Sequence, residues 1–329
     1  MSDDLFNNIC LELNLGCLTR MPEKLSGGFM HKIYRVQTSL GDYAIKLLNP
    51  EVMKRSDVFD NYNIAEQLEE KLLNAEIPIV PALKFNNKKM QCISGQYFYV
   101  FEFIDGKALN SNKIELEHCK CIGELLAKIH KIELSNKSIT KCKINIDWDY
   151  YINLAKSQAI EIVEMLQQHK KLLIESQAKG NESYERLPVI SSISNGDLDV
   201  KNVLWVNNKP FVIDLECLKY GNPFLELLEL ALCWSGYEHC NINYKYIEQF
   251  ISSYFAIFGM CKIDWSVLYY SNNGRLKWLE YNVKRALRIE CNEEEERLLG
   301  IEQVKDTIQH IIYYNIIGEE LINRLSRLF

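Results

Sequence analysis

The chain has 329 residues, of which 47% are hydrophobic and 25% are charged, a composition that is ordinary for a globular protein. This length predicts one large domain or two modest lobes. The formal net charge of −6 disfavours a nucleic-acid partner, because that kind of binding needs a basic surface to displace the counterions of the phosphates.

Two β-rich runs near the N-terminus predict a hairpin. Ile33–Thr38 and Asp42–Leu48 flank the turn residues Leu40 and Gly41. Successive side chains of a strand point to opposite faces, and the apolar residues of the second run alternate with Lys46. We therefore expect Lys46 on the face opposite to that apolar row.

A helix and a further strand follow the hairpin. The apolar stripe over Val58–Asn74 predicts a helix, which Pro78 and Pro81 should end. Alternating aromatic residues predict a strand over Tyr97–Phe103. The turn dipeptide that begins at Asp105 should stop this strand.

The pattern beyond residue 106 is mostly helical. Apolar residues recur at helical spacing over 116–129, 160–166 and 304–316, the last of these in a long C-terminal helix. One island interrupts the pattern, because Asn202–Val206 and Phe211–Leu215 predict two short strands joined by four residues.

This island carries the strongest chemical motif of the chain. An Asp, an Asn five residues later, a hairpin and an Asp that ends an apolar strand form the arrangement of a kinase catalytic loop and metal loop. Transfer of a phosphoryl group needs hard oxygen ligands for Mg²⁺ and a separate carboxylate that accepts the proton of the attacking hydroxyl. We therefore expect Asp197 to be the catalytic base, and Asn202 and Asp214 to be metal ligands. Glu216 fits either a metal contact or an ion pair.

Small residues and a hinge supply further candidate nucleotide contacts. Ser26, Gly27 and Gly28 precede the hairpin, where small side chains would let backbone N–H groups approach phosphates. Glu102 and Ile104 lie where a hinge between lobes would pair its backbone with the adenine edge. An ordinary turn and an ordinary strand end are the alternatives.

Lys46 is the candidate cation for the α- and β-phosphates. In this role it needs a carboxylate partner from the helix that follows the hairpin. Glu66 is the partner we expect, and Glu69, one turn further along, is an alternative that the sequence leaves open.

The order of these motifs resembles that of the aminoglycoside phosphotransferase/choline kinase-like family, over nearly the whole chain. Gly123–His130 is similar to the family's helix ahead of the catalytic loop, and Gly221–Leu227 is similar to the segment after the metal aspartate. The resemblance implies an α+β, two-lobed, protein-kinase-like fold. Residues 1–105 would form a small nucleotide-binding β-sheet lobe, and residues 106–329 a larger, mainly helical lobe for catalysis and acceptor binding.

The resemblance also implies the reaction, in which ATP or GTP with Mg²⁺ phosphorylates a hydroxyl group of a small molecule. Acidic and aromatic residues of the expected C-terminal lobe favour a cationic, aminoglycoside-like acceptor. The candidate acceptor residues are Asp147, Trp148, Trp234, Tyr237, Glu238, Trp278, Glu280 and Tyr281. The alternatives are a metabolic kinase of choline, a sugar or homoserine, and a non-catalytic nucleotide-binding pseudokinase.

Three positions depart from the family pattern. Asn195 stands where the family commonly has His, but Asn can still donate and accept hydrogen bonds, so we expect an active loop. Leu215 replaces a frequent Trp. His31 stands where Asn is frequent, and we expect it to be a surface residue, with a phosphate contact as the alternative.

Cysteine usage and the N-terminus bear on location and partners. The acidic start of the chain predicts no secretory signal, and the apolar runs are too short to span a bilayer. Eleven cysteines without zinc-site or redox spacing are expected to be reduced thiols. We expect a cytoplasmic monomer or homodimer with a small-molecule acceptor and with no membrane or nucleic-acid partner.

Overall fold

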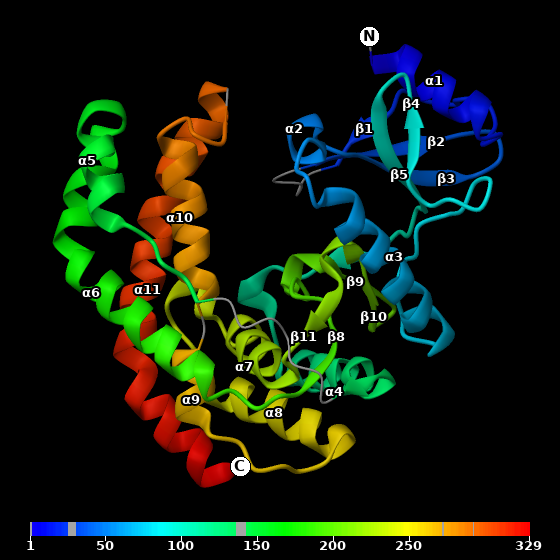
Figure 1. Cartoon of the computed structure of the whole chain (residues 1–329). Coiled ribbons are helices and arrows are strands. Elements are labelled where there is room, and N and C mark those ends of the chain that lie inside the picture. The colour runs from blue at the N-terminus through cyan, green and yellow to red at the C-terminus, as the bar shows by residue number, and fades with distance from the viewer. Residues whose placement is uncertain (1, 26–30, 136–142, 272, 292) are drawn as a thin grey trace. The chain divides into compact units, whose positions relative to one another are not determined.

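The computed structural model describes residues 2–25, 31–135, 143–271, 273–291 and 293–329 (Figure 1). Its internal contacts divide the chain into two units. The sheet unit contains Met1–Lys113 and Ile193–Tyr220, and the helical unit contains Ile114–Ser192 and Gly221–Phe329. The island that the sequence predicts to be catalytic therefore packs with the N-terminal sheet. The predicted lobe boundary after residue 105 stays a prediction.

The sheet unit is built on a five-stranded antiparallel sheet with the order β1-β2-β3-β5-β4. The predicted hairpin is confirmed, with Gln37 opposite Asp42 at its closed end. The strand expected over Tyr97–Phe103 is confirmed within one residue. The strands are β1 (Glu23–Lys24), β2 (Lys32–Gln37), β3 (Asp42–Leu47), β4 (Gln91–Ile93) and β5 (Gln96–Glu102).

A helix covers each face of this sheet. α1 (Ser2–Glu12) buries Phe6 against the apolar row of β3 that contains Ile45. α3 (Val58–Asn74), preceded by the short α2 (Pro50–Met53), packs on the other face, and its bounds are those that the sequence predicted. The strand alternation therefore turns Lys46 toward the α3 side, as expected.

The island forms a second small sheet with the order β10-β9-β6. Its strands are β6 (Lys107–Ala108), β9 (Val203–Val206) and β10 (Lys209–Val212). The connection between β9 and β10 is two residues long rather than four, because Asn207 and Asn208 both adopt positive φ, which suits a tight hairpin turn. The N–H of Val212 donates to the carbonyl of Pro78 at 2.8 Å, which fastens β10 to the segment after α3.

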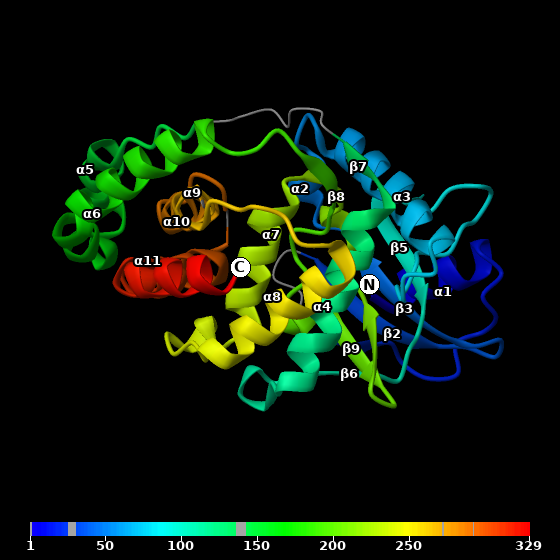
Figure 2. The ribbon, with the colours of Figure 1, turned by 90° about the horizontal axis from the view of Figure 1, so that it is seen from below.

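The helical unit holds eight α-helices in the part of the chain that the structure describes (Figures 1 and 2). Both views show α11 alongside α10, and these two helices share an apolar core with α5 and α6. The long C-terminal helix is confirmed. The helices are α4 (Leu116–Ile132), α5 (Trp148–Gln158), α6 (Ile160–Glu185), α7 (Pro223–Cys233), α8 (Tyr244–Phe258), α9 (Trp265–Tyr270), α10 (Gly274–Ala286) and α11 (Glu294–Leu328).

Close packing of α4 on α8 requires a glycine. A Cβ atom at Gly123 would lie 2.4 Å from the carbonyl oxygen of Phe250, a distance that no packed side chain can adopt. The remaining strands are short: β7 (Leu134–Ser135) pairs with the start of β8 (Ser191–Ser194), and β11 covers Lys219–Gly221. Among the described helices none combines the length and apolar character needed to cross a membrane. The predicted α+β class, with a small antiparallel sheet and a larger helical part, is confirmed.

Candidate active site

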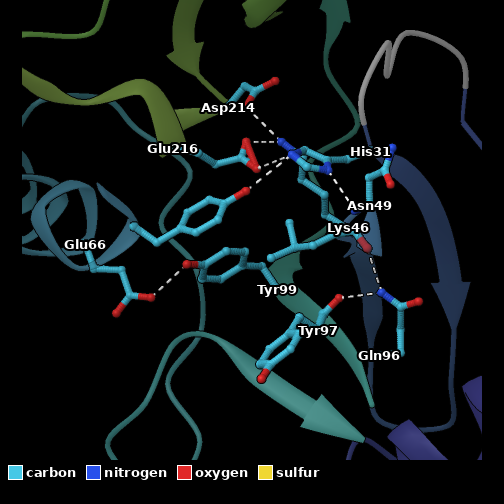
Figure 3. A network of polar contacts seen from close by, with 11 residues as sticks. His31, Lys46, Asn49, Glu66, Gln96, Tyr97, Tyr99, Asp214 and Glu216 are labelled. Atoms are coloured by element: carbon cyan, nitrogen blue, oxygen red, sulfur yellow. Dashed lines mark hydrogen bonds and ion pairs between the residues drawn. The ribbon is translucent and has the colours of Figure 1, made fainter. Parts of the chain in front are cut away.

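A buried ion cluster forms where β3 meets the loop after β10 (Figure 3). The side chain of Lys46 is only 6% exposed, and its Nζ lies 2.8 Å from Oδ1 of Asp214. The same ammonium group also forms an ion pair with Glu216. Burial lowers the pKa of Lys46, but the two carboxylates outweigh this effect and raise it. Lys46 is therefore a charged group at neutral pH, and it joins segments 168 residues apart.

The backbone of Asp214 adopts the left-handed conformation, with φ 61° and ψ 61°. This conformation costs a non-glycine residue on the order of 1 kcal/mol, and Asp tolerates it better than most residues. Asp214 directly precedes a short 3-10 helix over Leu215–Cys217. Unfavourable backbone geometry that persists beside a buried ion cluster is typical of a functional site.

The two carboxyl groups of the cluster, those of Asp214 and Glu216, have shifted pKa values of opposite direction. Burial raises the pKa of Glu216, and the neighbouring Asp214 adds to this, while Lys46 opposes it. Burial also works to raise the pKa of Asp214, but the hydrogen bond with Glu216 and the charge of Lys46 hold it below its usual value. Glu216 is therefore the carboxylate that takes up a proton first.

The loop of Asp197 is attached to this cluster. Asn202 is buried, and its Nδ2 donates to the backbone carbonyl of Asp197 at 2.8 Å. The carbonyl of Asn202 accepts from the N–H of Ile213 at 3.0 Å, next to Asp214. The backbones of Asn202 and Asp214 are therefore neighbours, and the role of these residues as metal ligands stays a prediction.

Asp197 has an unusual environment for a carboxylate. Burial, followed by repulsion from Asp199, raises its pKa to about 6, although Lys201 opposes the shift. Asp214 also contributes to the increase, which places the two carboxylates within electrostatic reach of each other. A carboxyl group with a pKa near neutrality is better able to accept a proton during catalysis than an ordinary Asp.

The partner of Lys46 differs from the two that we expected. Glu66 accepts a hydrogen bond from the hydroxyl of Tyr99 at 2.8 Å and lies apart from the ammonium group (Figure 3). Tyr99 stands directly opposite Lys46 across the β3–β5 pair, so its ring reaches toward the same helix. Glu69 is bound by Lys89 at 2.8 Å. In this structure Glu216 therefore supplies the carboxylate that the helix was expected to provide.

His31 is buried, with 8% exposure, so our expectation of a surface residue is wrong. The N–H of Asn49 donates to its Nδ1 at 3.0 Å, which places the proton of the neutral ring on Nε2. Nε2 lies 3.6 Å from Oε1 of Glu216 and 3.3 Å from the hydroxyl of Tyr62. Burial, assisted by the charge of Lys46, lowers the pKa of His31 to about 4, so the ring is neutral at pH 7.

The hairpin register contained the signal for this burial. Ile33 stands opposite Lys46, and His31 lies two residues earlier, so strand alternation puts both on the face of Lys46. The sequence pattern predicted a strand that begins at Ile33, with His31 in the turn before it.

The structure describes only some of the remaining residues that were predicted to contact the nucleotide. Ser26, Gly27 and Gly28 lie outside the described residues. Glu102 ends β5 with an exposed side chain, and Ile104 is half-buried beyond it. Their hinge role stays a prediction.

Several candidate acceptor residues are buried in the core of the helical unit or already contact other side chains there. Trp148 and Trp234 are 2% and 0% exposed, so they belong to the core because their large apolar surfaces are fully packed. Tyr237 stacks on Arg275. Glu280 accepts from Tyr151 at 2.7 Å.

Comparison with known proteins agrees with this arrangement. Residues 23–251 match the model of the phosphotransferase enzyme family designated APH. Among curated proteins, Stress response kinase A of Shigella flexneri is 22% identical over 192 residues, which cover 56% of this chain and 55% of that protein. The chain thus spans about half the length of the curated relatives it matches.

Solved structures share the fold at low identity. Spectinomycin phosphotransferase APH(9)-Ia, in complex with ADP and spectinomycin, has a TM-score of 0.68 and 13% identity, with 94% of this chain and 98% of that chain covered. A choline/ethanolamine kinase family protein from Mesorhizobium loti has a TM-score of 0.59 and 13% identity, with 96% and 99% covered. Because the family model matches more than half of the chain, this protein belongs to the phosphotransferase enzyme family, and the family and enzyme class predicted from the sequence are confirmed.

Proposed function

We propose that this chain transfers the terminal phosphoryl group of ATP or GTP, with Mg²⁺, to a hydroxyl group of a small molecule. The observation that carries the proposal is the buried cluster of Lys46, Asp214 and Glu216, to which the Asp197 loop is attached through Asn202. The relatives crystallised with ADP and with an ATP analogue support a nucleotide donor.

The donor atoms of the cluster fit a divalent cation. The carboxyl groups that face Lys46 present only hard oxygen acceptors, and Asp214 stays ionised because its pKa is held below its usual value. No group of three or more His, Cys, Asp or Glu residues suited to a metal occurs among the described residues. Mg²⁺ often takes only one or two protein carboxylates and completes its shell with phosphates and water. Asp214 and the amide oxygen of Asn202 would hold the ion, which would neutralise phosphate charge.

Asp197 would act on the acceptor. Its half-buried carboxylate would orient the hydroxyl group and accept the proton of this group as the phosphoryl group is transferred. Asn202 holds the backbone of Asp197 in place by its hydrogen bond to the carbonyl oxygen. Positioning of this kind lowers the barrier because the orientation of the reactants is fixed before the reaction.

Lys46 would contact the phosphates of the nucleotide. A cavity of about 20 Å³ between α3 and the sheet is lined by both Glu66 and Glu216. A single water needs about 10–15 Å³. Glu66 and Glu216 therefore border the same small cavity, and Glu66 stays the helix carboxylate that we propose for orienting Lys46 when phosphates compete for the ammonium group.

An aminoglycoside-like acceptor is the class that we favour. The relatives named for spectinomycin and for choline/ethanolamine support a small acceptor. Of the aromatic candidates, Trp278 is 43% exposed and lies 5.5 Å from the ring of Tyr281. An exposed aromatic face of this kind suits a cation.

An acceptor screen that reads nucleotide consumption tests this proposal. The panel contains aminoglycosides, choline, ethanolamine, hexoses and homoserine, each with ATP or GTP and with or without Mg²⁺. We expect Mg²⁺-dependent consumption with at least one acceptor, and its loss in Asp197→Asn. Mg²⁺-dependent nucleotide binding without turnover on any acceptor would instead assign a pseudokinase. Turnover that Asp197→Asn leaves unchanged would refute the role of that residue.

A further inference from the structure

A cavity within the helical unit carries two cationic side chains and no acidic one. It lies among α6, α9, α10 and α11 and has a volume of about 40 Å³. Arg275 and Lys179 line it together with Ser176, and none of the described residues along its wall is Asp or Glu. This charge balance is the opposite of that expected for a site that binds a cationic acceptor.

Arg275 is held rigidly with part of its hydrogen-bonding capacity unused. Its guanidinium group lies between the rings of Tyr314 and Tyr237, at 4.0 and 4.7 Å from their centroids. Nε donates to the hydroxyl of Tyr237 at 2.9 Å. Nη1 is buried and has no hydrogen-bond partner among the described residues. A buried donor left unsatisfied is costly, and more so when it is charged.

The tyrosine hydroxyls around the guanidinium are already used. Tyr237 donates to the carbonyl of His310 at 2.8 Å, and Tyr314 donates to the carbonyl of Tyr269 at 2.7 Å. The charge of Glu229 contributes to the raised pKa of Arg275, after burial, which acts in the opposite direction, and the two tyrosines. The aromatic stack therefore fixes the guanidinium without neutralising it.

Helix α6 adds two more donors to the lining of the cavity. Ser176 and Lys179 are three residues apart, so they lie on the same face of the helix. The hydroxyl oxygen of Ser176 is buried without a partner in the described structure. Lys179 is exposed, and its Nζ lies 5.2 Å from the ring of Tyr270, which also lines the cavity. A fixed guanidinium, a hydroxyl and an ammonium group thus border one space.

We infer that this cavity binds an oxyanion of phosphate size. Guanidinium groups bind phosphate and carboxylate through paired charge-assisted hydrogen bonds, and the hydroxyl and ammonium groups would complete the shell. A water needs about 10–15 Å³, so the cavity has room for roughly three waters, which suits an anionic group and excludes a whole nucleotide. The inference does not use the ion cluster of the sheet unit, since all of the residues that line the cavity lie in the helical unit.

Binding of inorganic phosphate, measured by titration calorimetry at constant ionic strength, tests this inference. We expect saturable binding that Lys179→Gln weakens by about threefold to tenfold, because one charge-assisted contact is lost. Lys171→Gln is the matched control, since this lysine lies on the same helix with a side chain that is 89% exposed. The control should bind phosphate as the unaltered protein does. Arg275→Lys keeps the charge, removes the paired donors and should weaken binding further.

Three results would overturn the inference. One is an absence of saturable binding. Another is an equal effect of Lys171→Gln and Lys179→Gln, which would indicate nonspecific attraction. The third is binding that Lys46→Met abolishes and Lys179→Gln leaves intact, which would place the phosphate in the ion cluster of the sheet unit. A parallel titration with O-phosphoethanolamine separates a free anion from a phosphate group on a larger molecule: tighter binding identifies the carried group, and weaker binding identifies the free anion.

Discussion

Replacing Asp197 with Asn should abolish activity and, at the same time, stabilise the fold at neutral pH. Burial and the charge of Asp199 raise the pKa of Asp197 from 3.8 to about 6. The folded protein therefore disfavours the ionised carboxylate relative to the unfolded chain. A shift of this size corresponds to roughly 3 kcal/mol at about 1.36 kcal/mol per pH unit. We expect a gain of roughly 1–3 kcal/mol, because the amide keeps the shape of the side chain but loses part of its hydrogen bonding.

The direction of the pKa shift determines how the stabilisation by Asp197→Asn varies with pH. A carboxylate with a raised pKa destabilises the fold where it is ionised, which is above pH 6, and has no such effect below its unfolded value of 3.8. The gain from Asp197→Asn should therefore be greatest at pH 7–8 and should shrink as the pH falls through 6 toward 4. The assay is thermal unfolding of both proteins across this range, without Mg²⁺ or nucleotide. The expected difference in Tm at pH 8 is a few degrees.

A control separates this effect from a general change in charge. Asp306 is exposed on α11, so Asp306→Asn should leave Tm nearly unchanged at every pH. If Asp197→Asn were less stable than the unaltered protein at pH 8, or if its effect on Tm did not vary with pH, then the fold would not raise the pKa of Asp197.

Three further predictions follow from particular contacts. Lys46→Met leaves Asp214 and Glu216 without their cation and should cost about 3 kcal/mol of unfolding free energy in a denaturant titration. A second change, Glu216→Gln, should recover part of that loss, and no recovery would contradict the ion cluster. His31→Ala should lower kcat/KM about tenfold, because it removes the acceptor for the Asn49 N–H and the group that faces Glu216. His31→Gln should lower kcat/KM less, because Gln can still accept that hydrogen bond. Equal losses in the two variants would refute a positioning role for His31. Gly123→Ala should lower the free energy of unfolding by about 1–3 kcal/mol, because its Cβ would meet the carbonyl oxygen of Phe250 at 2.4 Å. Thermal unfolding measures this loss, and Lys128→Ala, on the exposed face of α4, is the control that should change Tm little.

Elements with a strong local pattern could be predicted from the sequence. The hairpin and α3 were placed correctly because strand alternation and helical periodicity are properties of short segments. The predicted four-residue connection between β9 and β10 was too long. The left-handed conformation of Asn207 and Asn208 allows a turn of only two residues. The helix α1 was missed altogether.

The partners of charged groups were harder to predict than the groups themselves. The motif predicted that Asn202 and Asp214 act together, and the backbone hydrogen bond between Asn202 and Ile213 makes their segments neighbours. The choice of Glu216 over Glu66 as the carboxylate beside Lys46 depends on Tyr99, which binds Glu66 from a strand far along the chain. Burial of His31 likewise depends on the register of two strands. Such contacts arise from tertiary packing, which local periodicity does not contain.

The most direct test of the account is equilibrium binding of a non-hydrolysable ATP analogue with and without Mg²⁺. The unaltered protein should bind the analogue more tightly when Mg²⁺ is present. Asp214→Asn should lose this Mg²⁺ dependence, because the amide cannot replace a charged ligand of the ion. Equal Mg²⁺-dependent affinity in both proteins would contradict the assignment of Asp214, and an absence of nucleotide binding by the unaltered protein would contradict the proposed function itself.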